Sequence, residues 1–187
     1  MKLHLTQRES VLAELREALT VLSRNKLGGL IPEVRSNLGY ALPGASGYDE
    51  IAAFPGRITQ IGDDIFACRE PAFDASRHIA RVILAAMRHD PRIRAAMNIR
   101  YSPAILDACK NAGLRMAFFD RRQEPKDVKE REGSTLEWGT KQALLGFDGT
   151  PDLVYDEGEV GKEPMIRILG RNPMEVTEKI IRIKQNL

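Results

Sequence analysis

The chain has 187 residues, and its 43% hydrophobic and 29% charged content is typical of globular domains, which excludes a disordered or fibrous protein. Its 28 basic and 26 acidic residues are too evenly balanced to indicate a nucleic-acid partner. Two distant cysteines without a CxxC motif, and no apolar run of the ~18 residues that span a bilayer, predict a single cytoplasmic domain over residues 1–187 without disulfides or a membrane segment.

The segment 5–25 has the pattern of an amphipathic helix. Thr6 and Glu9 have the spacing of a capping box, and the aliphatic residues that follow recur at helical intervals. Gly28 and Gly29 end the helix. A helix-turn-helix needs a second helix after a tight turn, so this segment does not favour DNA binding.

Residues 29–69 are predicted to form short strands and tight turns. The stretch 29–47 is rich in Gly, Pro, Asn and Ser, with short apolar pieces such as Leu30-Ile31 between them. Two strands, at 51–59 and 65–69, are then joined around Gly62-Asp63-Asp64. We expect these two strands to form a hairpin.

Helices and strands alternate over the rest of the chain. We expect helices at 74–88, 103–113, 134–145 and from 173 onwards, and strands at 95–101, 116–119, 153–155 and 165–169. The strand at 116–119 is expected to be buried, and Ser134 and Glu137 are spaced as another capping box. Because hairpin-like connections recur, the pattern predicts an α/β fold with a mixed sheet and helices packed on it.

The polar stretch 121–133 interleaves basic and acidic side chains. Such alternation is typical of a solvated, mobile loop rather than of a DNA-binding face. A loop of this kind could cover an active site as a lid.

The motifs of common nucleotide-binding proteins and hydrolases are missing, so polar residues in Gly- and Pro-rich loops are the candidates for chemistry. Arg57 either closes a surface turn or holds a phosphate with its planar guanidinium group. His78 either packs locally or lies near a helix start, where the helix dipole favours an anion.

The remaining candidates have two interpretations as well. Gly161-Lys162 is either the tip of a hairpin or a phosphate contact made by backbone amides and the ammonium group. The carboxylates either cap turns or position a hydrated magnesium ion; they are Glu33, Asp63, Asp64 and Asp120.

Several segments together resemble the ThiN-type thiamine-phosphate synthase family, which occurs alone or as the C-terminal domain of hydroxymethylpyrimidine phosphate kinase fusions. They are IPEVRSNLGYALPGA at 31–45, FPGRI at 54–58, SRHIAR at 76–81, FDRRQEP at 119–125, TLEWGTKQA at 135–143 and PDLVYDEGEVGKEPMIRILG at 151–170. The resemblance covers residues 27–187 and leaves 1–26 as an added N-terminal helix. It implies a three-layer α/β/α fold with a mixed sheet, similar to class II aldolases.

The resemblance also implies an activity: hydroxymethylpyrimidine diphosphate and hydroxyethylthiazole phosphate condense to thiamine phosphate and pyrophosphate, with Mg²⁺ accompanying the diphosphate. The family's critical arginine and histidine fall on Arg57 and His78. Class II aldolases bind zinc through several histidines, whereas this chain has only His4, His78 and His89, so no zinc site is inferred. The substrate-binding candidates are Glu33, Arg35, Asn37, Asp120, Arg121, Gly161 and Lys162.

The alternative is a regulatory domain that senses thiamine phosphate without making it. Relatives fused to a DNA-binding domain look like such sensors and are thought to lack the catalytic pair, so retention of Arg57 and His78 favours the enzyme. The role of His78, toward the leaving diphosphate or the thiazole phosphate, stays open. A homodimer is the default expectation for a soluble assembly.

Overall fold

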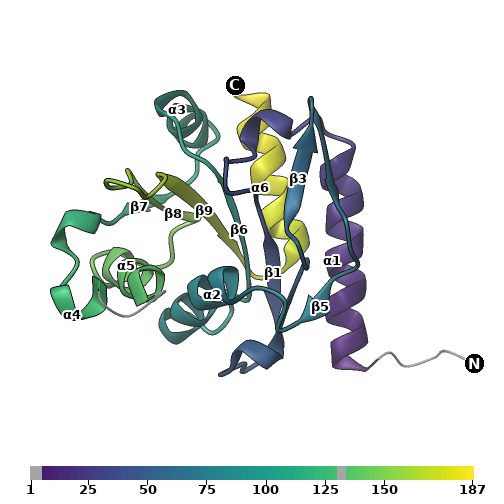
Figure 1. Cartoon of the computed structure of the whole chain (residues 1–187), viewed down its shortest axis with the longest axis horizontal. Coiled ribbons are helices and arrows are strands. Elements are labelled where there is room, and N and C mark those ends of the chain that lie inside the picture. The colour runs from purple at the N-terminus through teal and green to yellow at the C-terminus, as the bar shows by residue number, and fades with distance from the viewer. Residues whose placement is uncertain (1–5, 130–133) are drawn as a thin grey trace, which may run out of the picture.

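The computed structural model describes residues 6–129 and 134–187. Within them, seven strands form one sheet in the order β5-β2-β1-β6-β9-β8-β7 (Figure 1). Their bounds are β1 Leu38–Ala41, β2 Ile51–Ala53, β5 Ala72–Phe73, β6 Ala95–Arg100, β7 Met116–Phe118, β8 Leu153–Asp156 and β9 Met165–Gly170. Strands β7 and β8 pair in parallel and the other neighbours pair antiparallel, so the predicted mixed sheet is confirmed.

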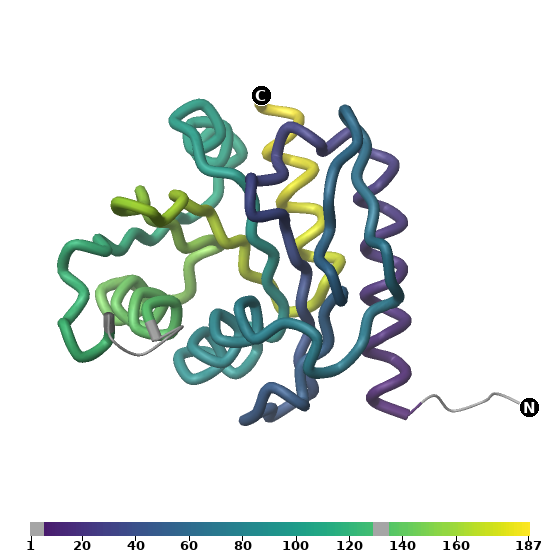
Figure 2. Tube along the Cα trace, in the orientation of Figure 1, coloured from purple at the N-terminus to yellow at the C-terminus, as the bar shows by residue number. Residues whose placement is uncertain are grey.

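Helices cover both faces of this sheet. On one face pack α1 (Gln7–Ser23), α3 (Pro103–Asn111) and α6 (Pro173–Gln185). On the other pack α2 (Arg77–His89) and α5 (Ser134–Leu145), with the short α4 (Lys126–Lys129) beside α5. Helices α1 and α6, from opposite ends of the chain, lie side by side (Figure 2). Within the described ranges, no helix is long and apolar enough to cross a membrane.

Alternation along the strands creates two hydrophobic cores and one polar patch. On β6, Met97 and Ile99 face α1, α3 and α6, while Ala96 faces the core formed with α2 and α5. Further along that second face of the sheet, the apolar residues give way to Asn98 of β6 and Arg167 of β9, which are neighbours in the strand register. The sheet therefore has a polar end beneath the start of α2.

Local capping signals place most helix starts correctly. The predicted box at Thr6 is present, and Ser102 and Asn172 each accept a hydrogen bond from the third residue of the helix that follows. Helix α2 begins at Arg77 rather than at Asp74, because Asp74 has a left-handed backbone with φ of 56°. The side chain of Ser134 lies outside the described part, so the second capping box stays a prediction.

The predicted strand at 51–59 is wrong as one element. Strand β2 ends at Ala53, and a turn with positive φ at Gly56 (80°) and Arg57 (70°) leads into β3 (Ile58–Ile61). Strand β3 leaves the main sheet and pairs with β4 (Asp64–Ala67) around Gly62 in a separate two-stranded sheet, so the predicted hairpin turn is confirmed. Short strands were expected around Leu30-Ile31. The chain instead forms the 3-10 helix η1 (Gly28–Leu30), which ends just before Ile31.

Two further expectations need correction. The stretch from Arg121 is not a solvated loop throughout: it forms the 3-10 helix η3 (Arg121–Gln123) and then α4, and Arg121 and Glu124 are only 7% and 5% exposed. Residues 130–133 of the expected lid lie outside the described residues, and the lid itself stays a prediction.

The strand predicted at 116–119 was expected to be buried. It forms β7, which lies at the edge of the sheet and exposes Phe118, and β9 and β8 lie between it and β6.

Candidate active site

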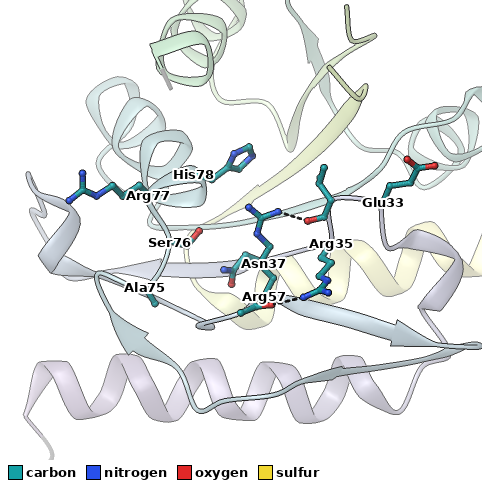
Figure 3. Close-up of a pocket in the computed structure, with 10 residues that line it drawn as sticks. Glu33, Arg35, Asn37, Arg57, Ala75, Ser76, Arg77 and His78 are labelled. Carbon is teal, nitrogen blue, oxygen red and sulfur yellow. Dashed lines mark hydrogen bonds between the residues drawn. The ribbon is translucent and has the colours of Figure 1, made fainter. Parts of the chain in front are cut away.

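A cavity of about 600 Å³ opens at the polar end of the sheet (Figure 3). Its walls come from the loop before β1, the turn between β2 and β3, and the start of α2; they are Glu33, Val34, Arg35, Asn37, Gly56, Arg57, Ala75, Ser76, Arg77 and His78. A neighbouring cavity of about 140 Å³ shares much of this lining and reaches Asn98. Volumes of this order accommodate small-molecule ligands.

Side-chain amides and backbone pairing hold the first two walls together. Ser36 and Ile58 exchange two backbone hydrogen bonds, of 3.0 and 2.8 Å, although neither wall belongs to the main sheet at this point. The side chain of Asn37 accepts from the amide of Phe54 and donates to its carbonyl oxygen, both at 3.0 Å. Asn98 accepts from the amide of Asn37 at 2.8 Å. Asn37 therefore links the two walls, and substrate binding by its side chain stays a prediction.

Two arginines reach the cavity from strained backbone. Arg35 and Arg57 have φ of 68° and 70°, in the left-handed region that non-glycine residues rarely adopt. The guanidinium group of Arg57 donates through Nη1 to the carbonyl oxygen of Val34. Both side chains are exposed, and among the described residues neither forms an ion pair with a carboxylate. Their charges are available to an anionic ligand.

His78 lies in the first turn of α2, and its ring points toward the middle of the cavity (Figure 3). The surrounding protein withdraws water from the imidazole, and Arg167, Arg57, Arg121 and Arg81 add positive charge; together they lower the pKa of His78 from 6.5 to about 4. His78 as a whole residue is nevertheless exposed and lines the cavity. At neutral pH His78 is therefore an uncharged hydrogen-bonding group.

A buried ion triad lies behind His78. Asp156 of β8 accepts from Arg121 Nε at 2.5 Å and from Arg167 Nη1 at 2.8 Å. Burial opposes ionisation of Asp156, but the two guanidinium groups outweigh it and lower its pKa. Phe119 packs its ring 5.6 Å from the Arg167 guanidinium carbon. With two cations and one carboxylate, the triad adds positive charge to the site.

The structure brings together five of the predicted site residues: Glu33, Arg35, Asn37, Arg57 and His78 all line the cavity. Arg121 does not line it but contributes to the electrostatic environment of His78. The other three lie elsewhere, namely Asp120, Gly161 and Lys162.

Those three have local partners. Asp120 pairs with Arg122 at 2.8 Å and caps η3. Gly161 and Lys162 belong to the tip of the β8–β9 hairpin, as the simpler interpretation predicted, and the Lys162 ammonium lies 3.7 Å from Glu124. Substrate binding by these residues stays a prediction.

Sequence reasoning missed Asn98, Asp156, Glu163 and Arg167. Arg167 is 1% exposed, in the middle of the apolar strand β9. A charged residue inside an apolar strand was the available signal, because burial of a charge requires a partner. Nothing local identified that partner as Asp156, eleven residues earlier.

Among the described residues, no group of three or more His, Cys, Asp and Glu side chains could hold a metal ion. Asp64, one of the magnesium candidates, pairs with Lys26 at 2.7 Å at the surface. Glu33 is the carboxylate that lines the cavity. Magnesium stays a prediction; when substrate phosphates supply most of its oxygen ligands, one or two protein carboxylates suffice.

The fold and the site define an α/β protein with an arginine-lined cavity at one end of a mixed sheet. Residues 14–182 match the family model described as thiamine-phosphate synthase ThiN. The chain is 42% identical over 170 residues to the thiamine-phosphate synthase ThiN of Methanothermobacter thermautotrophicus, covering 90% of each protein. The chain therefore belongs to the ThiN family of thiamine-phosphate synthases.

Two further comparisons extend this assignment. The bifunctional thiamine biosynthesis protein ThiDN of Methanocaldococcus jannaschii is 41% identical over 175 residues, which are 92% of this chain and 40% of that protein. The crystal structure of a C-terminal domain of phosphomethylpyrimidine kinase superposes with a TM-score of 0.89 at 39% identity, covering 96% of this chain and all of that one. L-Fuculose-1-phosphate aldolase from Thermus thermophilus, at 12% identity and a TM-score of 0.52 over 94% of this chain and 92% of that one, is alike in fold alone.

Proposed function

We propose that this chain condenses hydroxymethylpyrimidine diphosphate with hydroxyethylthiazole phosphate to give thiamine phosphate and pyrophosphate. The observation that carries the proposal is the cavity itself, which Arg35, Arg57 and His78 all line and in which Glu33 is the acidic lining residue among those described. The guanidinium group of Arg57 points to the side of the cavity where His78 lies (Figure 3). Both substrates carry phosphate groups, so a cavity with positive charge not paired to carboxylates suits them.

The reaction replaces one bond by another at a single carbon. The bond between the pyrimidine methylene carbon and the diphosphate oxygen breaks, and its electron pair leaves with pyrophosphate. The lone pair of the thiazole nitrogen forms the new carbon–nitrogen bond, so no strong base is needed. The electron-rich pyrimidine stabilises positive charge on the methylene, which leaves stabilisation of the departing diphosphate as the protein's main task.

Arg57 is the proposed main donor to the leaving diphosphate. Its Nη1 is held by the carbonyl of Val34, and the rest of its planar donor set remains for phosphate oxygens. Arg35 lies beside it, with Nη1 3.5 Å from the carbonyl oxygen of Gly56. Because both side chains start from constrained backbone, little reorganisation is needed when charge develops on the oxygens.

His78 is proposed to act as a neutral hydrogen-bond donor rather than as a general acid. The support is its pKa of about 4, which leaves almost no protonated imidazole in the free protein at pH 7. A bound anion would raise this pKa, since it would offset the four guanidinium charges around the ring. Its position at the start of α2 favours contact with an anionic group.

Magnesium is proposed to enter as part of the diphosphate substrate, with Glu33, a carboxylate that lines the cavity, as a partner for one of its water molecules. The finer description of the fold as class II aldolase-like, without the zinc of those enzymes, is likewise a proposal. A cytoplasmic location is also a proposal, and the free thiols at Cys68 and Cys109 are consistent with it. A homodimeric assembly is a further proposal.

The test incubates the purified protein with both substrates and magnesium and measures thiamine phosphate and pyrophosphate. Arg57→Ala and His78→Ala are assayed beside the wild type, and thermal melting shows whether each variant is folded. Product from the wild type that is lost in the folded variants supports the synthase. Tight binding of thiamine phosphate without any turnover would instead support the sensor.

A further inference from the structure

Glu163 joins two segments of the site that are far apart in sequence. It lies in the hairpin between β8 and β9, and its carboxylate accepts from the backbone amides of Glu33 at 3.0 Å and Val34 at 3.2 Å. One oxygen serves each amide, so the carboxylate holds both of these consecutive residues at once. Glu163 lines neither cavity of the site.

The segment that Glu163 holds is the one that holds Arg57. Val34 donates its amide to Glu163 and accepts at its carbonyl oxygen from Arg57 Nη1. The next residue, Arg35, has a positive φ of 68°, a conformation that persists only where surrounding contacts enforce it. On its far side the loop is held by Asn98, which donates to the carbonyl oxygen of Arg35 at 3.0 Å.

We propose that Glu163 is a positioning residue: through the amides of Glu33 and Val34 it fixes the Val34 carbonyl, and that carbonyl aims the guanidinium group of Arg57. This inference rests on the catalytic role proposed for Arg57. A carboxylate this close to an anion site repels the substrate, so its presence is explained by what it holds.

Because Glu163 is negatively charged, the effect of losing its charge and the effect of losing its positioning contacts differ in kinetic measurements. Removing a negative charge from an anion site should strengthen binding of the diphosphate and lower its KM. Loss of positioning should instead lower kcat, because a displacement of about 1 Å at a reacting group costs up to ~10²-fold. A fall in kcat with unchanged or lower KM therefore identifies positioning.

The experiment compares Glu163→Gln and Glu163→Ala with Glu157→Gln, a matched control on the same hairpin whose carboxylate faces Tyr101 at 3.3 Å. We expect kcat to fall about tenfold in Glu163→Gln, which keeps one acceptor oxygen, and about 30- to 100-fold in Glu163→Ala. Glu157→Gln should stay within about twofold of the wild type. Equal kcat in the wild type and both Glu163 variants, with melting unchanged, would overturn the proposal.

A double-mutant cycle separates action through Arg57 from a general structural role. In the Arg57→Ala background, Glu163→Ala should lower kcat by less than about threefold, because the group it positions is gone. Fully additive effects would contradict the proposal. If Glu163→Ala does not fold, the cycle is run with Glu163→Gln.

If the wild type makes no thiamine phosphate, the proposed function fails, and the same cycle is measured by calorimetry as affinity for magnesium pyrophosphate. A change of affinity on Glu163→Ala that disappears in the Arg57→Ala background would still support the positioning role of Glu163. Fully additive changes of affinity, or no change in either background, would overturn it.

Discussion

Two charged cavities lie at opposite ends of the sheet and differ in how their cations are paired. The second cavity, of about 300 Å³, lies near the starts of β6, β7 and β8. There Arg92 pairs with Asp90 at 2.9 Å, and Lys179 pairs with Asp152 at 2.9 Å and with Glu175 at 3.0 Å. Arg115 is the exception among the lining cations described, because its guanidinium group donates to the carbonyl oxygens of Asp148 and Thr150. In the candidate active site, Arg35 and Arg57 donate to the backbone carbonyl oxygens of Gly56 and Val34.

Cations that pair with carboxylates stabilise the fold, whereas Arg35 and Arg57, which do not, can still bind an anionic ligand. Cations matched by carboxylates have little residual field, whereas cations held by carbonyl oxygens keep theirs. The second cavity also lacks backbone strain: positive φ at non-glycine residues lining either cavity occurs at Arg35 and Arg57. The number of charged lining residues alone would have favoured the second cavity as the active site, because more of its lining residues are charged.

The largest expected effect is on stability, at the triad behind the active site. Asp156→Asn leaves two buried guanidinium groups without a counter-charge, and we expect it to lower the free energy of unfolding by about 3–5 kcal/mol. Urea denaturation measures the change. The matched control is Asp152→Asn in the second cavity, which is partly exposed and should cost less. Equal losses at the two positions would contradict the contrast between the triad and the second cavity.

The next effect is on catalysis. Arg57→Ala removes a donor to the departing diphosphate, and we expect kcat to fall by about 10²–10³ with melting almost unchanged. Arg171→Ala, which removes an exposed arginine paired with Glu175 at the second cavity, should leave kcat within about twofold. Steady-state assays of both variants decide the matter, and a fall of less than about tenfold for Arg57→Ala would count against its assigned role.

These contrasts also show which features the sequence could predict. The starts of α1, α3 and α6 were predictable because each depends on a cap and an amide three residues away, as at Thr6, Ser102 and Asn172. The order of the strands in the sheet was not, because β8 and β9 enter between β6 and β7 through contacts distant in sequence.

The site was predictable only in part, for the same reason. The resemblance placed Arg57 and His78, and the structure puts both on one cavity. The positive φ of Arg57 depends on pairing between Ser36 and Ile58, and no local pattern encodes it. Glu163 looked like an ordinary hairpin residue because its partners lie 130 and 129 residues earlier.

A smaller effect is expected at the second cavity. Lys179 donates to the carbonyl oxygen of Leu169 at 2.7 Å and pairs with Asp152 and Glu175, with 12% of its side chain exposed. Lys179→Met should lower the free energy of unfolding by about 1–2 kcal/mol and leave kcat within about twofold. Thermal denaturation and the synthase assay test both parts. A loss of activity without a loss of stability would make this cavity functional after all.

The effect that is smallest at neutral pH, and that grows only as the pH falls, is the pH dependence that His78 contributes. Its pKa of about 4 in the folded protein lies below the ordinary 6.5, so between these values the unfolded chain binds a proton that the native protein does not. The native state therefore loses stability relative to the unfolded state as pH falls from 6.5 toward 4, and above 6.5 this contribution is constant. His78→Gln should remove that slope, so melting temperatures of the two proteins should diverge as pH falls from 7 to 4.5, with the wild type losing more. Parallel curves would mean that His78 titrates normally, and the neutral hydrogen-bond donor proposed for catalysis would then have to be replaced by a group that is partly protonated near neutral pH.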